Sequence, residues 1–128
     1  HAIALPASTP EGRLLVVEGA GGLMVPITRR TLFIDVFQRW GAPVVLVART
    51  GLGTINHSLL SIEALSRRDI PILGVVFVGE EVADTERTIC EYADVARLGR
   101  LPRLPDLSAE SLRAAFAEGF RAADFVGR

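Results

Sequence analysis

Three short apolar runs divide the chain, and each is almost continuous in valine, isoleucine and leucine instead of alternating with polar residues. They cover residues 14–17 (LLVV), 43–48 (PVVLVA) and 72–78 (ILGVVFV). Strands that are covered on both faces of a parallel sheet have this pattern. The runs therefore predict three buried parallel strands.

Amphipathic stretches separate and follow these runs. In the first stretch, Phe33, Phe37 and Trp40 recur at helical spacing, and Gly41 supplies a C-terminal stop. A later stretch has Ser108 as an N-cap candidate, with a helix expected after it. The first stretch predicts a helix over residues 31–41, and two further helices are expected over residues 55–68 and 84–96. Residues 98–105 (LGRLPRLP) are expected to form a short strand or an extended loop.

The resulting order of elements is β-α-β-α-β-α-(β)-α. This order predicts an α/β fold with a parallel sheet, flanking helices and right-handed crossovers. No repeat or linker divides the chain, so we expect residues 1–128 to form a single α/β domain. Three or four strands are fewer than such a sheet usually has, and the chain begins at a histidine, so we expect part of a larger sheet.

Composition excludes several classes of function. Fourteen basic and 15 acidic residues give a net charge of -1, and no long basic cluster occurs, so a nucleic-acid partner is not expected. No apolar stretch reaches the ~20 residues of a membrane helix, so no membrane partner is expected. The single cysteine, Cys90, excludes an internal disulfide and fits a cytoplasmic location.

Glycine-rich residues follow the first apolar run, at the sheet edge where ligands collect in parallel sheets. Glu18 ends the run, and three of the next four residues are glycines. A carboxylate beside exposed amides suits Mg²⁺ and phosphate oxygens, whereas a tight turn would use the same residues structurally. The spacing leaves both interpretations open. The third glycine of the dinucleotide fingerprint is absent, which disfavours a Rossmann cofactor.

The second run is followed by residues 51–57 (GLGTINH). Its two glycines make a loop for close approach, and Thr54 is the predicted N-cap of the next helix. Free amides at a helix start bind anions such as a carboxylate or a phosphate. An ordinary capped junction explains the same residues and is favoured when the segment is taken alone. We interpret His57 as a structural residue outside the chemistry.

These segments occur together in one order: VVEGAGGLMVPI, PVVLVARTGLGTINHSLLSIEAL, GVV and LGRLPRL. In that order they resemble dethiobiotin synthetases, the ATP-dependent ligases of biotin synthesis. The resemblance extends from about residue 14 to residue 106. It implies a P-loop NTPase-like fold and a cytoplasmic homodimer that joins CO2 to 7,8-diaminopelargonate, with ATP and Mg²⁺ as cofactors.

The resemblance also implies roles for single residues. Glu18 is similar to a carboxylate that holds Mg²⁺ and the nucleotide phosphates, beside a loop made of Gly19, Ala20 and Gly21. The segment that receives the substrate carboxylate across the dimer interface is similar to Leu52, Gly53, Thr54, Ile55 and Asn56. The loop along the adenosine of ATP is similar to Leu101, Pro102, Arg103 and Asp106.

The chain departs from this family in two places. Val78 and Gly79 stand where well-known members have an asparagine that recognises adenine, so adenine is expected to meet backbone groups or to be weakly discriminated. No G-x-x-x-x-G-K-S/T loop, whose amides and lysine cradle phosphates, occurs in the chain. We therefore expect the C-terminal portion of a synthetase, without a catalytic residue of its own and inactive when alone.

Two other functions stay open. A cobyrinate synthase-type amidotransferase module resembles the chain at EGAG, although its continuation differs from GLMVPI and from GLGTINH. A shortened, non-catalytic dimeric relative with a binding or regulatory role would keep the fold and lose the chemistry.

Overall fold

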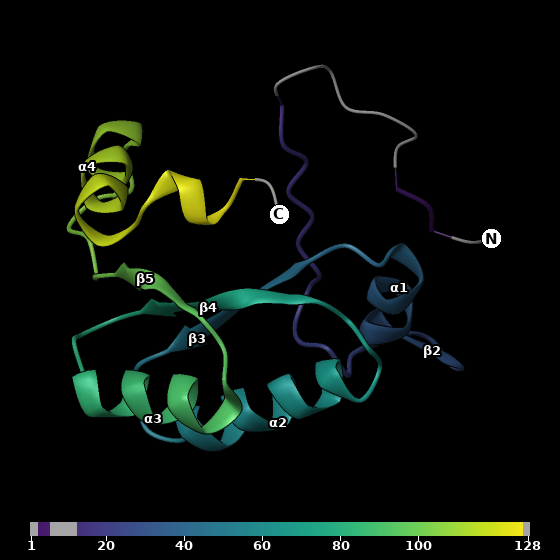
Figure 1. Ribbon diagram of the computed structural model, residues 1–128. Coiled ribbons are helices and arrows are strands. Elements are labelled where there is room, and N and C mark those ends of the chain that lie inside the picture. Colours follow the sequence, from purple (N-terminus) through teal and green to yellow (C-terminus); the bar gives the residue numbers. More distant parts are fainter. Residues whose placement is uncertain (1–2, 6–12, 127–128) are drawn as a thin grey trace.

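The computed structural model describes residues 3–5 and 13–126, which form an α/β arrangement (Figure 1). The helices are α1 (Phe33–Trp40), α2 (Thr54–Ser66), α3 (Ala83–Ala93) and α4 (Ala109–Gly119), followed by a short 3-10 helix, Ala122–Asp124. The strands are β1 (Pro26–Thr28), β2 (Thr31–Leu32), β3 (Val44–Arg49), β4 (Ile72–Val78) and β5 (Arg97–Leu101). The predicted α/β class is confirmed.

A parallel sheet of three strands, in the order β3-β4-β5, organises the molecule. The strands predicted at residues 43–48 and 72–78 are confirmed, and residues 98–101 belong to strand β5. Helices α2 and α3 lie on the same face of this sheet (Figure 1). Successive parallel crossovers of one hand place their helices in this way.

The main core lies between the sheet and these two helices. Val75 and Phe77 enter it from β4 and Ile89 enters it from α3, and all three side chains are fully buried. Neighbouring residues of a strand face opposite sides, so Val47 of β3 points away from this core and is 63% exposed. Helix α4 lies on the side of the sheet away from α2 and α3 (Figure 1), and its Phe116 lines a cavity together with Val76 of β4 and Leu101 of β5.

The predicted strand at residues 14–17 is wrong for this structure. The segment is irregular and all four side chains are exposed, with Val16 at 87%. A strand needs a neighbouring strand to satisfy its backbone groups. In the described part of the chain, the sheet consists of β3, β4 and β5, and none of these strands pairs with residues 14–17.

Residues 26–32 form an antiparallel hairpin, β1 with β2, that the hydrophobic pattern does not predict. These strands are too short to show a period. The hairpin leads into α1, where the Leu32 N–H donates to the Asp35 carboxylate (2.8 Å). Helix α1 ends at the predicted Gly41, whose φ of 62° is the left-handed conformation that favours glycine.

The remaining helices follow the prediction with shifted ends. Helix α3 ends before the predicted residue 96 because Asp94 takes the left-handed conformation, with φ at 51°. Helix α4 starts after Ser108 as predicted, and the Ser108 hydroxyl accepts a hydrogen bond from the Ser111 N–H (3.2 Å). Among the helices of residues 3–5 and 13–126, none has the length and apolar character needed to span a membrane.

Candidate functional site

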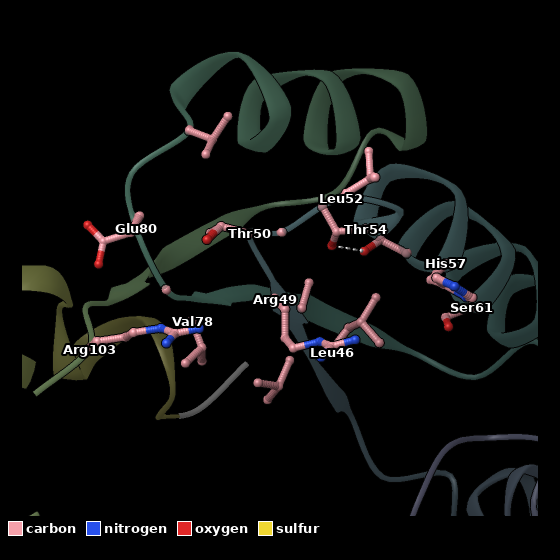
Figure 2. Close-up of a pocket in the computed structure, with 16 residues that line it drawn as sticks. Leu46, Arg49, Thr50, Leu52, Thr54, His57, Ser61, Val78, Glu80 and Arg103 are labelled. Atoms are coloured by element: carbon pink, nitrogen blue, oxygen red, sulfur yellow. Dashed lines mark hydrogen bonds between the residues drawn. The ribbon is translucent and has the colours of Figure 1, made fainter.

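A pocket of about 800 Å³ lies where β3 and β4 end and α2 begins (Figure 2). We call it the strand-end pocket. It occupies the carboxyl edge of the parallel strands, which is where ligands bind in open sheets of this kind. Its lining consists of Leu46, Val47, Ala48, Arg49, Thr50, Gly51, Leu52, Thr54, His57, Ser58, Ser61, Val78, Gly79, Glu80, Val82 and Arg103.

The start of α2 forms one wall of the pocket, and its N-cap differs from the predicted one. Gly53, with φ at 89°, is the N-cap, and Thr54 is already the first helical residue. Glycine adopts this left-handed conformation readily, whereas threonine does not, which explains the one-residue shift. The Thr54 hydroxyl instead lies 3.4 Å from the Ser58 hydroxyl, and both residues are buried (Figure 2).

The first turn of α2 is suited to an anion. The Thr54 N–H donates to the Gly51 carbonyl (3.2 Å), and the His57 N–H donates to the Gly53 carbonyl (3.1 Å). Ile55 and Asn56, between them, are exposed first-turn residues, whose amides lack the partners that later helix amides have. The turn therefore presents donors and the positive end of the helix dipole.

Gly79, after β4, is held by two hydrogen bonds to the end of β5. Its N–H donates to the Leu101 carbonyl (3.0 Å), and its carbonyl accepts from Arg100 Nη1 (2.9 Å). Its φ is +130°, and a Cβ at this position would collide with the Thr50 hydroxyl. A larger residue is therefore disfavoured by both backbone strain and space. Because its own N–H is already paired, Gly79 does not offer a free amide to an adenine base.

Charged side chains stand around this part of the pocket. Arg103 reaches along the β4 end beside Val78, and Glu80 lies on the other side of the opening (Figure 2). Arg49 at the end of β3 adds a second guanidinium to the lining. Two arginines near one pocket favour an anionic ligand, because guanidinium groups match carboxylate and phosphate oxygens.

The segment at residues 18–22 lies elsewhere, against α1. A Cβ on Gly19 would meet the Phe37 ring at 3.1 Å, and Gly21 has a positive φ of 93°. Close packing and turning thus account for these two glycines. Glu18 is exposed and is not part of the strand-end pocket lining.

Glu18 is the carboxylate that the resemblance assigns to Mg²⁺. Within the described residues, no group of three or more His, Cys, Asp or Glu side chains is arranged to hold a metal. Mg²⁺ in nucleotide sites is usually held by one or two carboxylates together with phosphates and water. The exposed Glu18 carboxylate is free to supply one of the ligands of such a site.

The expected adenosine loop is divided between two places. Arg103 lines the strand-end pocket, whereas Leu101 lines an apolar cavity of about 500 Å³ beside α4. The Asp106 carboxylate accepts hydrogen bonds from the Ser108 N–H (2.8 Å) and the Ser111 hydroxyl (2.8 Å), before α4. Hydrogen bonds from Ser108 and then Ser111 lower the pKa of Asp106, because they favour its charged form.

The structure thus brings some predicted residues together and leaves others apart. The strand-end pocket gathers Leu52 and Thr54 from the expected substrate segment with Val78, Gly79 and Arg103 from the expected nucleotide set. Outside its lining lie Glu18, Gly19, Ala20, Gly21, Gly53, Ile55, Asn56, Leu101, Pro102 and Asp106.

Sequence reasoning missed several lining residues. Arg49 and Thr50 directly follow an apolar run, so the rule on strand ends contained the signal for them. Glu80 follows the third run in the same way. His57 also lines the pocket, with its ring near Gly53. Ser58 and Ser61 had no signal of their own, because only the helical phase of α2 brings them to the pocket.

Comparison with known proteins places the chain among P-loop NTPase-type domains. Its residues 2–111 match an AAA domain family. The match covers most of the chain, and the chain belongs to this AAA domain family.

Relatives named "ATP-dependent dethiobiotin synthetase BioD" confirm the resemblance seen in the motifs. The chain is 65% identical over 115 residues to the protein of that name from Rhodopseudomonas palustris (strain TIE-1), covering 90% of this chain and 54% of the relative. It is 63% identical over 117 residues to the one from Novosphingobium aromaticivorans, covering 91% and 57%. The Brucella anthropi relative is 66% identical over 106 residues, covering 83% and 50%. The chain spans about half the length of the curated relatives it matches.

Proposed function

We propose that this chain is the C-terminal portion of a dethiobiotin synthetase, which joins CO2 to 7,8-diaminopelargonate at the expense of ATP. One observation carries the proposal. Residues expected to hold the substrate (Leu52 and Thr54) and residues expected to hold the nucleotide (Val78, Gly79 and Arg103) line one pocket. A ligase that activates its substrate with ATP needs the two ligands side by side, so this juxtaposition supports the assignment.

The proposed reaction has three steps. One amine of the substrate takes up CO2 as a carbamate, and a carbamate oxygen attacks the γ-phosphorus of ATP with release of ADP. The second amine then attacks the carbamate carbon, and inorganic phosphate leaves as the ureido ring closes. When the pocket holds substrate and ATP side by side, these steps become effectively intramolecular. This proximity is the main contribution to catalysis that we expect from the pocket.

The residues of this chain have distinct roles in the proposal. The first turn of α2, with Ile55 and Asn56, binds the substrate carboxylate through backbone donors. Arg103 lies along the nucleotide. Glu18 shares in holding Mg²⁺, which when bound neutralises the charge of the transferring phosphoryl group.

The phosphate cradle is proposed to come from the rest of the synthetase. Removing a single well-placed donor from a phosphoryl or oxyanion site costs about 3 kcal/mol of transition-state stabilisation. Losing an entire phosphate loop leaves negligible turnover. Residues 1–128 alone are therefore expected to be inactive, and the longer gene product is expected to supply the loop and its lysine.

A homodimer completes the proposal. Leu52 is fully exposed and Ile55 is 37% exposed, although both are apolar residues beside the first turn of α2. Apolar side chains in such a place fit an interface with a second copy, across which the substrate tail would be received. A cytoplasmic location follows from the same assignment.

Binding measured by calorimetry tests the proposal on the full-length gene product. Diaminopelargonate and ATP with Mg²⁺ should each bind, and Glu18→Gln should weaken the Mg²⁺ dependence of nucleotide binding. Glu110→Gln in α4 is the matched control, because it also neutralises an exposed glutamate. If the Mg²⁺ dependence of nucleotide binding is unchanged in Glu18→Gln, the metal assignment is wrong. If the wild-type protein binds neither diaminopelargonate nor ATP, the non-catalytic relative is favoured.

A second variant separates the two ligands. Asn56→Trp places a bulky side chain on the exposed first turn of α2 and should weaken diaminopelargonate binding while nucleotide binding stays within about twofold. Glu63→Trp, further along the same helix, is the control, because it disturbs only an exposed ion pair with Arg67. Equal loss of both ligands in Asn56→Trp would indicate a folding defect instead.

A further inference from the structure

A buried glutamate links α3 to both ends of β5. Glu86 lies in the first turn of α3 and is only 3% exposed. Its Oε2 atom lies 2.7 Å from Arg97 Nε, and its Oε1 atom lies 3.6 Å from Arg100 Nε. Among the described residues, Oε1 has no hydrogen-bond partner. A buried carboxylate is costly unless it is paired, so both arginines are needed around it.

The two arginines differ in what else they contact. Arg97, at the start of β5, pairs with Glu86 and has a side chain that is 47% exposed. Arg100, near the end of β5, is 22% exposed and also donates through Nη1 to the Gly79 carbonyl (2.9 Å). Its Nη2 atom lies 3.9 Å from Glu81 Oε2. Arg100 alone therefore connects the buried carboxylate to the loop after β4.

That loop forms a wall of the strand-end pocket through Val78, Gly79 and Glu80. The Gly79 carbonyl is directed toward Arg100, and its N–H toward the Leu101 carbonyl. With these two bonds made, the peptide units on either side of Gly79 have a defined orientation. The position of the next side chain, Glu80, at the pocket opening follows from that orientation.

We propose that Glu86 and Arg100 are positioning residues for the nucleotide, acting through the Gly79 carbonyl on the loop that borders the base. We call the three residues the Glu86 relay. The inference rests on the proposed function, because it takes the ligand beside Val78 and Gly79 to be a nucleoside triphosphate. It accounts for a loop that lacks a base-reading asparagine and is nonetheless held by the charged network behind it.

The relay predicts a selective effect on nucleotide in the full-length gene product. Arg100→Gln should raise the KM for ATP about tenfold, which is the loss expected for one hydrogen bond to a charged group. The KM for diaminopelargonate should change less than about twofold. The ratio of ATP to GTP turnover should fall, because a loosened loop discriminates bases less well. Arg100→Lys keeps the charge and should restore part of the ATP affinity.

Arg97→Gln is the matched control. It removes an arginine from the same strand and from the same carboxylate without touching Gly79. Both glutamine variants should lower Tm, but only Arg100→Gln should change the KM for ATP. An equal rise in the KM for ATP in both variants, or an equal rise for both substrates in Arg100→Gln, would show that the network is merely structural and would overturn the proposal.

Nucleotide affinity separates failure of the relay from failure of the proposed function. If wild type forms no dethiobiotin but binds ATP, the proposed function fails, and calorimetric Kd values for ATP in Arg100→Gln and Arg97→Gln still decide the relay. A wild type that neither turns over nor binds ATP contradicts both.

Discussion

Two valine-rich runs of this chain have similar composition, but only one of them forms a strand. Residues 44–49 (VVLVAR) form the strand β3, paired in parallel with β4, whereas residues 14–17 (LLVV) are irregular and exposed. The difference lies in their neighbours and not in their own side chains. β3 has β4 beside it and α2 beneath it, while residues 14–17 have no strand beside them in the described part of the chain.

This contrast bears on the site. The residues that follow β3 and β4 are held in defined positions at the strand-end pocket, because their strands are fixed in the sheet. Glu18 follows the run that lacks a partner and lies outside that pocket lining. A side chain at a strand tip is positioned only as well as the strand is. We therefore expect the position of Glu18 to depend on a neighbouring strand from the rest of the proposed synthetase.

The largest effect is expected from the partnered strands. Phe77 of β4 is fully buried in the main core, so Phe77→Ala in the 128-residue chain should lower the free energy of unfolding by about 3–5 kcal/mol. Urea titration followed by circular dichroism measures it. Val47→Ala, on the open face of the same sheet, should cost far less. Similar losses at both positions would mean that the two faces are not distinguished by packing.

A pair of valine variants compares the two runs directly. Val75→Ala in β4 should cost about 2 kcal/mol, since it removes two buried methyl groups and leaves a cavity. Val16→Ala should change stability by less than about 0.5 kcal/mol, since Val16 is exposed.

The same two valine variants in the full-length gene product show whether residues 14–17 gain a partner strand there. There the cost of Val16→Ala should approach that of Val75→Ala, because a partner strand would bury it. A cost that stays near zero would show that residues 14–17 are not a strand in the longer protein either.

The N-cap of α4 depends on local hydrogen bonds, and we expect its loss to lower the free energy of unfolding less than the loss of a buried strand residue. Ser108 caps α4 through its own hydroxyl, so Ser108→Ala should lower the free energy of unfolding by about 1 kcal/mol. Ser108→Asp supplies another capping oxygen and should recover most of the loss. A full loss in both variants would mean that α4 depends on a serine contact other than the cap.

The smallest effect concerns pH. The folded pKa of Asp106 lies below its unfolded value of about 3.9, so its contribution is fully present above that value and is lost as pH falls through the folded pKa. Urea midpoints compared between about pH 6 and pH 2.5 should therefore fall less in Asp106→Asn than in wild type. Parallel curves for the two proteins would show that Asp106 does not contribute.

Much of the fold could be predicted where neighbours are supplied by this chain itself. The run at residues 72–78 corresponds to β4 in full, because both of its neighbours, β3 and β5, lie in the same chain. The prediction fails at residues 14–17, where pairing depends on partners that a hydrophobic pattern does not show. The prediction also misses the hairpin at residues 26–32, because its strands are too short to show the alternating pattern of a strand.

Part of the strand-end pocket lining could be named from the sequence. The family resemblance points to Leu52, Thr54 and Arg103, and the structure brings these three residues to one pocket, while their roles stay predictions. The predicted N-cap of α2, Thr54, is one residue too late, because glycine and threonine are both common at the start of a helix and the sequence does not show the positive φ of Gly53. The contacts of Arg100 with Glu86 and Gly79 span 14 and 21 positions in the chain, and no local pattern indicates them.

The most direct test of the account is the formation of dethiobiotin by the full-length gene product from 7,8-diaminopelargonate, ATP, Mg²⁺ and isotopically labelled bicarbonate. Mass spectrometry should detect one labelled carbon in the product, with one ADP and one phosphate released for each molecule formed. ATP-independent product, or no labelled product from a folded protein that carries its complete sequence, would contradict the account.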